Sequence, residues 1–392
     1  MQLTTDFECG GGKRLTALGD GHWRLEASGD GSGYDKYFCV KVTSEPAEAP
    51  AELLLEIHPD ADLGEDGANF RASHFPSHIW CCGGDWSGWR PLRNTWEDAV
   101  TFHDRVIDLR IPVQPGTQLY VATNPPCRYS DLLGWIERLR ERHGARLQAD
   151  SIGQSAEGRD IPVLRLPGPR PGLPKLVVLA GQHPSEHCGS WACEGIVEYG
   201  LSSIREARDL LGRFDLAVVP MINPDGNVHG LSGANAEGVN LFGDFTGASD
   251  GQQPKAVESR RLWEWLSGES PPQVILHFHG YMGWQQFAQP PYDGVYFLRD
   301  AEQLYQAPEQ LAAYRAIQDR LIFETPGYTA SWRAGLLTDE SLEHHLARRF
   351  GTLSAFYEIN SASVGAFEQF RRGPQVLAAV LRALVRDVQA FG

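Results

Sequence analysis

The spacing of hydrophobic positions changes near residue 128 of this 392-residue chain. Before that point, short stretches alternate between apolar and polar positions, for example 53–57, 106–111 and 118–122, and turn residues separate them. Alternation over a few residues between turn signals predicts short strands with one buried face. We therefore expect residues 1–127 to form an N-terminal domain, an antiparallel β-sandwich.

Beyond residue 128 the pattern is typical of a sheet covered by helices. From Tyr129 onward apolar residues recur at helical spacing, and the final segment, from Val376 to Val388, fits an amphipathic helix. Between them lie four near-continuous apolar runs, at 175–180, 214–222, 273–278 and 353–359. Such runs predict strands buried on both faces. We expect residues 128–392 to form an α/β domain with a mostly parallel sheet flanked by helices.

Charge and composition exclude several classes of partner. The formal net charge is −15 and the isoelectric point is about 5.3. Nucleic acids and anionic membranes attract faces rich in Lys and Arg, so neither is expected as the main partner. The sequence contains neither a signal-peptide pattern nor an apolar run of about 18 residues, which predicts a soluble protein. The seven cysteines form no regular framework, so we expect reduced thiols in a cytoplasmic protein.

The best sign of chemistry is an H-x-x-E pattern, formed by His183 and Glu186 directly after the run 175–180. Catalytic zinc is usually held by three protein ligands, often two His and one Glu, with one position open to water or substrate. Ligands in open α/β sheets lie outside the carboxyl ends of strands, where this pair falls. The pattern also arises freely on surfaces, so another strand end has to supply the third ligand.

A third ligand is available at the end of the run 273–278. His277 and His279 share one side of the predicted strand, and His279, beside Gly280, stands at its end. We expect His279 to complete the metal site, whereas His187 points elsewhere. Two interpretations stay open for His277, which either orients a ligand or is a neutral core histidine bonded to the backbone.

A general base is predicted at Glu358, near the end of the run 353–359. Zinc lowers the pKa of a water to about 7, and hydrolysis still needs a carboxylate that passes its proton to the leaving amine. A carboxylate is costly to bury without a purpose, which favours the catalytic interpretation over an incidental strand-end residue. No G-x-S-x-G motif surrounds any serine, so a serine hydrolase lacks its usual signature.

Taken in order, these motifs resemble the zinc carboxypeptidases of the pancreatic-carboxypeptidase superfamily, and most closely their cytosolic carboxypeptidase branch. The resemblance spans almost the whole chain and rests on segments 129–132, 152–161, 183–186, 220–226, 279–280 and 357–358. It implies that His183, Glu186 and His279 bind zinc (Zn2+) and that Glu358 is the general base. It also implies a mixed sheet flanked by helices, with a β-sandwich in front of it.

The chain departs from the family pattern where the substrate is bound. Related chains carry Arg, Asn and Arg where this sequence has Gly233, Phe242 and Gly243, although Asn240 keeps the register. In the family these residues help to bind the substrate C-terminal carboxylate and to polarise the scissile carbonyl. Removing one partner of such a charge-assisted pair typically costs about 2 to 5 kcal/mol. His277 also replaces a commonly acidic residue.

Either the anchor has moved, or the substrate lacks a free terminal carboxylate. Arg299, Arg333 and Arg348 are candidate replacements, although each also suits a surface charge. Tyr328 and Tyr357 are candidates to stabilise the oxyanion, or else core aromatics. The predicted substrate-binding residues are Asn240, Tyr328 and Arg333.

Three functions are consistent with these residues. The leading hypothesis is a cytoplasmic zinc hydrolase that cleaves a peptide or amide bond by a zinc-activated water, with Glu358 as base and a specificity altered from ordinary C-terminal trimming. The second is a conventional metallocarboxypeptidase with a relocated Arg anchor. The third is a degenerate module that binds metal or peptide without turnover. The retained Glu358 disfavours this third function, because metal binding alone needs no base.

Overall fold

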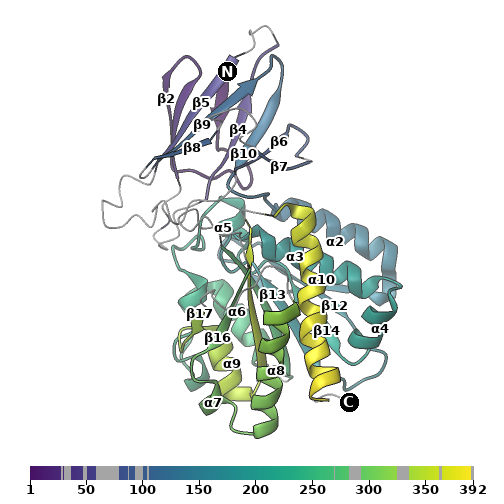
Figure 1. Cartoon of the computed structure of the whole chain (residues 1–392). Coiled ribbons are helices and arrows are strands. Elements are labelled where there is room, and N and C mark those ends of the chain that lie inside the picture. The colour runs from purple at the N-terminus through teal and green to yellow at the C-terminus, as the bar shows by residue number, and fades with distance from the viewer. Residues whose placement is uncertain are drawn as a thin grey trace.

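A sheet-rich N-terminal part lies at one end of a larger α/β part in the computed structural model (Figure 1). The structure describes residues 1–27, 30, 37–46, 51–58, 79–86, 88–92, 100–103, 106–268, 270–281, 293–324, 335–361 and 364–389. Strand β10 (Gln118–Ala122) is the last strand of the N-terminal part, and helix α2 (Tyr129–His143) is the first helix after it. The domain boundary after residue 127 falls between these elements and stays a prediction.

The N-terminal part consists of two sheets that share one core. In the described part of the chain, one sheet has the order β1-β4-β10-β6-β7 and the other the order β2-β3-β5-β9-β8. Buried side chains of both sheets, such as Val40 and Val121 of the first and Leu55 and Ile57 of the second, belong to one hydrophobic cluster. The predicted antiparallel β-sandwich is confirmed, with one parallel pair, β3 with β5. Side-chain alternation does not reveal strand direction.

The strands of the N-terminal part have the following bounds: β1 (Gln2–Thr4), β2 (Arg14–Gly19), β3 (His22–Glu26), β4 (Cys39–Thr43), β5 (Ala51–His58), β6 (Trp80–Gly83), β7 (Arg90–Pro91), β8 (Val100–His103) and β9 (Val106–Val113).

A mixed sheet forms the centre of the α/β part. Among the described residues it has eight strands in the order β11-β12-β14-β13-β15-β18-β16-β17. The four predicted apolar runs are its central strands, β13 (Lys175–Ala180), β14 (Asp215–Val219), β15 (Val274–Tyr281) and β18 (Leu353–Asn360), and they pair in parallel. The flanking strands are β11 (Gln148–Gln154), β12 (Asp160–Leu166), β16 (Gly294–Leu298) and β17 (Gly335–Leu337). The predicted fold class is confirmed.

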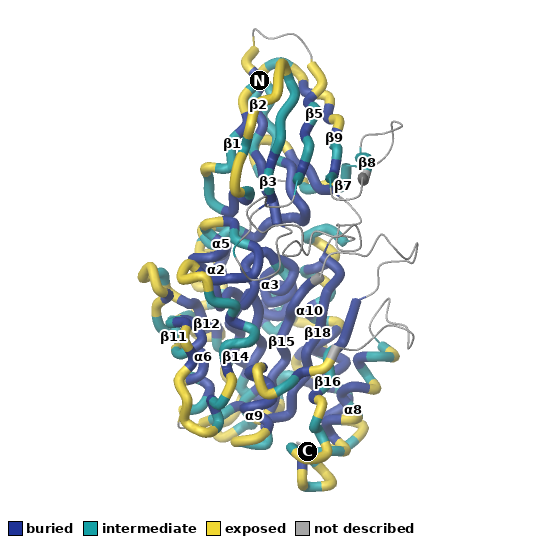
Figure 2. Tube along the Cα trace, turned by 90° about the vertical axis from the view of Figure 1, so that its left-hand side faces the viewer, coloured by how far each residue is buried: buried dark blue, intermediate teal, exposed yellow. Residues whose placement is uncertain are grey.

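Helices cover both faces of this sheet, so its central strands are buried (Figure 2). Val178 and Leu276 share a hydrophobic cluster with residues of α2, α3 (His187–Leu201), α8 (Pro308–Glu324) and α10 (Ala366–Arg382). Val177 and Ile275, one position away, share another cluster with α6 (Val257–Leu266) and α9 (Leu342–Phe350). Successive strand residues thus reach opposite layers of helix. The shorter helices are α4 (Arg205–Leu211), α5 (Pro224–Val228) and α7 (Ala301–Leu304).

Two further sequence expectations concern the chain end and the cysteines. The predicted final helix is α10, and a turn of π-helix follows it at Ala383–Asp387. All seven cysteines are buried and none is paired in a disulfide. Within the described residues, no helix combines the length and the apolar character that crossing a membrane requires.

Candidate metal and catalytic site

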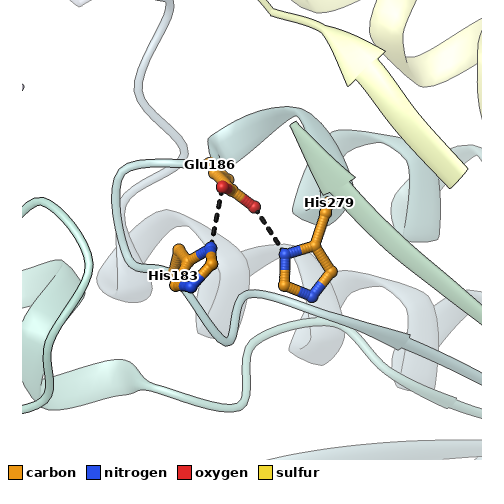
Figure 3. Close-up of side chains that lie close together, drawn as sticks. All are labelled: His183, Glu186 and His279. Carbon is orange, nitrogen blue, oxygen red and sulfur yellow. Dashed lines mark hydrogen bonds and ion pairs between the residues drawn. The ribbon is translucent and has the colours of Figure 1, made fainter. Parts of the chain in front are cut away.

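Two distant segments bring the predicted metal ligands together. His183 and Glu186 lie in the loop between β13 and α3, and His279 lies near the end of the neighbouring parallel strand β15. The chain leaves β13 through Gly181, whose φ of 74° is a conformation that suits glycine. The ligand atoms of the three residues all lie within 4.8 Å of one another. Figure 3 shows the carboxylate of Glu186 between the two imidazole rings.

The Nδ1 atoms of both histidines point at this carboxylate. His183 Nδ1 lies 2.8 Å from Oε1 of Glu186, and His279 Nδ1 lies 2.9 Å from Oε2. The backbone N–H of Gly280 also donates to Oε2, at 2.9 Å. A Cβ at Gly280 would come within 2.2 Å of the Sγ of Cys188, so only glycine permits this approach. The carboxylate is therefore held in place from three sides.

Side-chain amides hold the opposite nitrogen of each ring. His183 Nε2 lies 3.1 Å from Oδ1 of Asn240, and His279 Nε2 lies 3.1 Å from Oε1 of Gln182. Oδ1 of Asn240 also accepts the backbone N–H of Phe242, which identifies this atom as the oxygen. With a metal bound, the proton of His183 would lie on Nε2, toward the acceptor oxygen of Asn240, and Nδ1 would offer its lone pair to the metal. Partners of this kind commonly orient metal-binding histidines.

This geometry adds a second role to Asn240, that of orienting a candidate ligand. Its Oδ1 contacts His183 and the backbone N–H of Phe242, and its predicted contact with the substrate stays a prediction. Sequence reasoning missed Gln182 altogether. Gln182 contacts His279, which lies 97 positions away in the sequence, and a local sequence pattern cannot predict a contact over that separation.

The donor set fits zinc. Burial lowers the pKa of His279 to about 4, so this ring is neutral at pH 7 and able to bind a metal. Burial by itself would raise the pKa of Glu186, but His183 and His279 bring it well below its usual range, so the carboxylate is ionised. Two imidazoles and one carboxylate are a common ligand set of catalytic zinc.

Glu358 lies on the next strand, level with His279. The two residues are direct partners in the parallel pair β15 and β18, and such partners project from the same face of the sheet. Burial raises the pKa of the Cys188 thiol, and the charges of Glu186 and Glu358 raise it further, so both carboxylates lie near this sulfur. Glu358 is itself buried. It therefore stands beside the candidate ligands, and its role as a base stays a proposal.

His277 forms a buried pair with an acidic residue of α9. Its Nδ1 lies 2.6 Å from Oε1 of Glu343, and both side chains are almost fully buried. Burial by itself would raise the pKa of Glu343, but His277 lowers it, so the carboxylate is ionised. One of the two interpretations expected a core histidine bonded to the backbone. His277 is buried, but its Nδ1 contacts a carboxylate and not the backbone. The ring also contacts that of His279, with 4.5 Å between their centroids.

Carboxylates stand beside Gly233 and Gly243, the two glycines at which the resemblance predicts the loss of arginines. The backbone N–H of Gly233 donates to Oδ2 of Asp30 at 2.7 Å. A Cβ at Gly243 would lie 3.8 Å from Oε2 of Glu340. The third replaced position, Phe242, places its ring 6.0 Å from that of His183, between centroids. The structure thus brings negative charge and an aromatic ring to the three positions at which replacements are predicted.

The remaining candidates fall outside the site or outside the described residues. Arg299 is exposed, and Arg348 forms an ion pair with Asp250 at 3.1 Å. The hydroxyl of the buried Tyr357 donates to Asp293 at 2.8 Å, so this tyrosine is a core residue and no candidate for the oxyanion. The predicted substrate-binding residues Tyr328 and Arg333 lie outside the described residues.

Comparison with known proteins shows which family this site resembles. Residues 132–322 match the model of the zinc carboxypeptidase family, so this part of the chain is similar to that family of metallohydrolases. The matched region contains His183, Glu186 and His279 and ends before Glu358. The resemblance inferred from the ordered motifs is confirmed.

Individual relatives make the likeness more specific. Cytosolic carboxypeptidase 2 of Danio rerio is 28% identical over 215 residues, which cover 52% of this chain and 30% of that protein. The inactive metallocarboxypeptidase ecm14 of Sclerotinia sclerotiorum is 25% identical over 299 residues, 61% of this chain and 48% of that protein. The chain therefore matches less than half the length of either relative. The crystal structure of a metallo-carboxypeptidase from Burkholderia cenocepacia has the same fold, with a TM-score of 0.77, 21% identity and 100% coverage of both chains.

Proposed function

We propose that the protein is a zinc-dependent hydrolase of the carboxypeptidase type that cleaves a peptide or amide bond, with a specificity altered from C-terminal trimming. The observation that carries the proposal is the convergence of His183, Glu186 and His279, with Glu358 level with them on the adjacent strand. These three residues would hold the zinc ion. A location in the cytoplasm stays a prediction.

Zinc, when bound, would polarise the scissile carbonyl and lower the pKa of a water. Glu358 would take the proton of the attacking water and deliver it to the leaving nitrogen. Asn240 and Gln182 would keep the two histidines oriented, each through its Nε2 atom. The ring of Phe242 packs against those of His183 and His279, with 6.0 and 5.7 Å between centroids.

The charges at the substituted positions support the altered specificity. A substrate carboxylate near Gly243 would meet the carboxylate of Glu340 instead of a guanidinium. Two like charges 4 Å apart repel each other by about 4 kcal/mol at an effective dielectric constant of about 20. Glu340 is exposed, so solvent screens much of this repulsion. The balance still favours a substrate whose leaving group has no free carboxylate at this point.

The chemistry is tested by Glu358→Gln. We expect kcat toward a responsive amide to fall about 10²- to 10⁴-fold, because the variant has no group to carry the proton. Bound zinc, measured by atomic emission after gel filtration, should stay stoichiometric. Glu137→Gln on the surface of α2 is the matched control. Unchanged turnover in Glu358→Gln would contradict the role of the base, and no hydrolysis by the wild type across a broad amide panel, with zinc bound, would favour the degenerate module.

Specificity is tested with paired substrates, an N-acyl amino acid and its carboxamide. We expect the wild type to prefer the carboxamide in kcat/KM. The double variant Gly243→Arg/Glu340→Gln should shift the preference toward the acid by roughly tenfold or more, since it replaces a repulsive charge with an attractive one. A strong preference of the wild type for the acid would favour a conventional carboxypeptidase with a relocated anchor.

A further inference from the structure

The carboxylate of Asp30 reaches from the N-terminal part into a loop of the α/β part. Its Oδ2 accepts three consecutive backbone N–H groups, those of Ser232, Gly233 and Ala234, at 2.8, 2.7 and 2.9 Å. Consecutive N–H groups that converge on one point form a concave anion site, or nest. Hydrogen bonds to an ionised acceptor are roughly twice as strong as neutral ones. Asp30 is therefore an internal ligand of this backbone nest.

Ser232 of the nest is hydrogen-bonded to the loop that carries two of the candidate metal ligands. The carbonyl oxygen of Ser232 accepts the hydroxyl of Ser185 at 2.6 Å and its backbone N–H at 3.4 Å. Ser185 stands between His183 and Glu186 and is buried. The position of the metal loop thus depends on the position of Ser232.

Ala234, at the other end of the nest, is connected to the two side-chain amides that orient the histidines. Ala234 forms a β-bridge with Asn240, whose side chain contacts His183. The carbonyl oxygen of Ala234 also accepts Nδ2 of Asn223, and the same amide group donates to the carbonyl oxygen of Gln182. Both partners of the metal histidines are therefore tied to the segment that Asp30 holds.

We propose that Asp30 is a positioning residue for the metal site, acting from the N-terminal part through the 232–234 nest. The inference rests on the proposed zinc site and goes beyond it, because it makes metal binding depend on a residue of the other part of the chain. Without the carboxylate, three N–H groups lose a shared acceptor and the segment gains freedom. The hydrogen bonds that tie Ser185, Gln182 and Asn240 to this segment then no longer fix their positions.

The test measures zinc affinity by competition with a chelator in the full-length protein. We expect Asp30→Ala to weaken zinc binding about 10- to 100-fold, the range typical of partners that orient ligands. Asp30→Asn, which keeps one acceptor oxygen, should lose less. Added formate should restore affinity in Asp30→Ala, because a small carboxylate can enter the vacated nest, whereas chloride at the same ionic strength should not. Glu52→Ala, an exposed acid of the same part, is the control.

The outcomes separate positioning from general destabilisation. Loss of affinity that formate restores supports the inference. Unchanged affinity overturns it, and so does a loss that formate leaves in place while the melting temperature falls, because simple loosening of the two parts predicts that result. The affinity readout does not depend on turnover, so failure of the proposed hydrolysis and failure of this inference are distinguishable.

Discussion

Two His–Glu–His clusters in this chain look alike in distance and differ in almost everything else. On the second N-terminal sheet, Glu56 contacts His22 and His58, each with 2.9 Å between nitrogen and oxygen. In the α/β part, Glu186 contacts His183 and His279 at 2.8 and 2.9 Å. Both clusters have the residue types of a metal site. Only the cluster in the α/β part also has the burial and the ring orientation that metal binding requires.

Three physical differences separate the clusters. The N-terminal histidines offer Nε2 and have side chains 36% and 27% exposed, whereas His183 and His279 offer Nδ1 and are 5% and 1% exposed. Arg24 bonds to the carboxylate of Glu56, at 3.1 Å, and thus neutralises the charge that would attract a cation. Amide oxygens fix the back of each ring in the α/β cluster. Burial, ring orientation and, among the described residues, the lack of an ion pair from Lys or Arg to Glu186 decide which cluster suits zinc.

The largest effect should come from removing the central carboxylate of each cluster. Glu186→Gln should weaken zinc binding by more than about a hundredfold, beyond what partners of ligands usually contribute. Glu56→Gln should leave the affinity unchanged, because Arg24 already neutralises that carboxylate. Chelator competition measures both. Equal losses in the two variants would show that zinc does not distinguish the clusters and would break the comparison.

The next effect concerns the amides behind the rings. Gln182→Leu and Asn240→Leu should each weaken zinc binding about 10- to 100-fold, because the freed ring can rotate its lone pair away from the metal. Melting temperatures, followed by circular dichroism without metal, provide the control for folding. If both variants bind zinc as the wild type does, the carboxylate and burial alone define the site.

The smallest effect is a dependence of folding stability on pH, which arises from the N-terminal cluster. Burial by itself would raise the pKa of Glu56, but hydrogen bonds from His58, Arg24 and His22 lower it to about 2 from an ordinary 4.5. A lowered folded pKa stabilises the folded state above about pH 4.5, and this gain disappears as the pH falls through about 2. Glu56→Gln should therefore lower the free energy of unfolding by up to about 1 kcal/mol at pH 7, as is usual for partly exposed ion pairs.

Urea titrations of wild type and Glu56→Gln between pH 7 and pH 3 measure this difference. It should narrow as the pH drops below 4.5. If the difference in the free energy of unfolding stays constant over the whole pH range, the substitution acts by changing side-chain packing and not by removing a charge.

Sequence patterns predicted the parts of the site that depend on residue type and strand end. His183 with Glu186 follows one buried strand, and His279 and Glu358 stand near the ends of two others. Parallel strands align their carboxyl ends, so these residues were expected to meet. Gln182, Glu343 and Asp30 were missed, because each acts through a partner far along the chain, as in the 66-residue separation of His277 and Glu343.

The sequence by itself determined the order of the central elements, the two helix-covered faces of the sheet and the donor residues. The loss of cations at Gly233 and Gly243 stays a prediction. Periodicity records which face is buried, and residue type records which atoms can bind a metal. Only the tertiary structure decided that Nδ1 of His183 faces Glu186 and that carboxylates from Asp30 and Glu340 stand beside the two glycines. Ring orientation and local charge depend on acceptors that other strands and loops bring into place, and no local pattern encodes those neighbours.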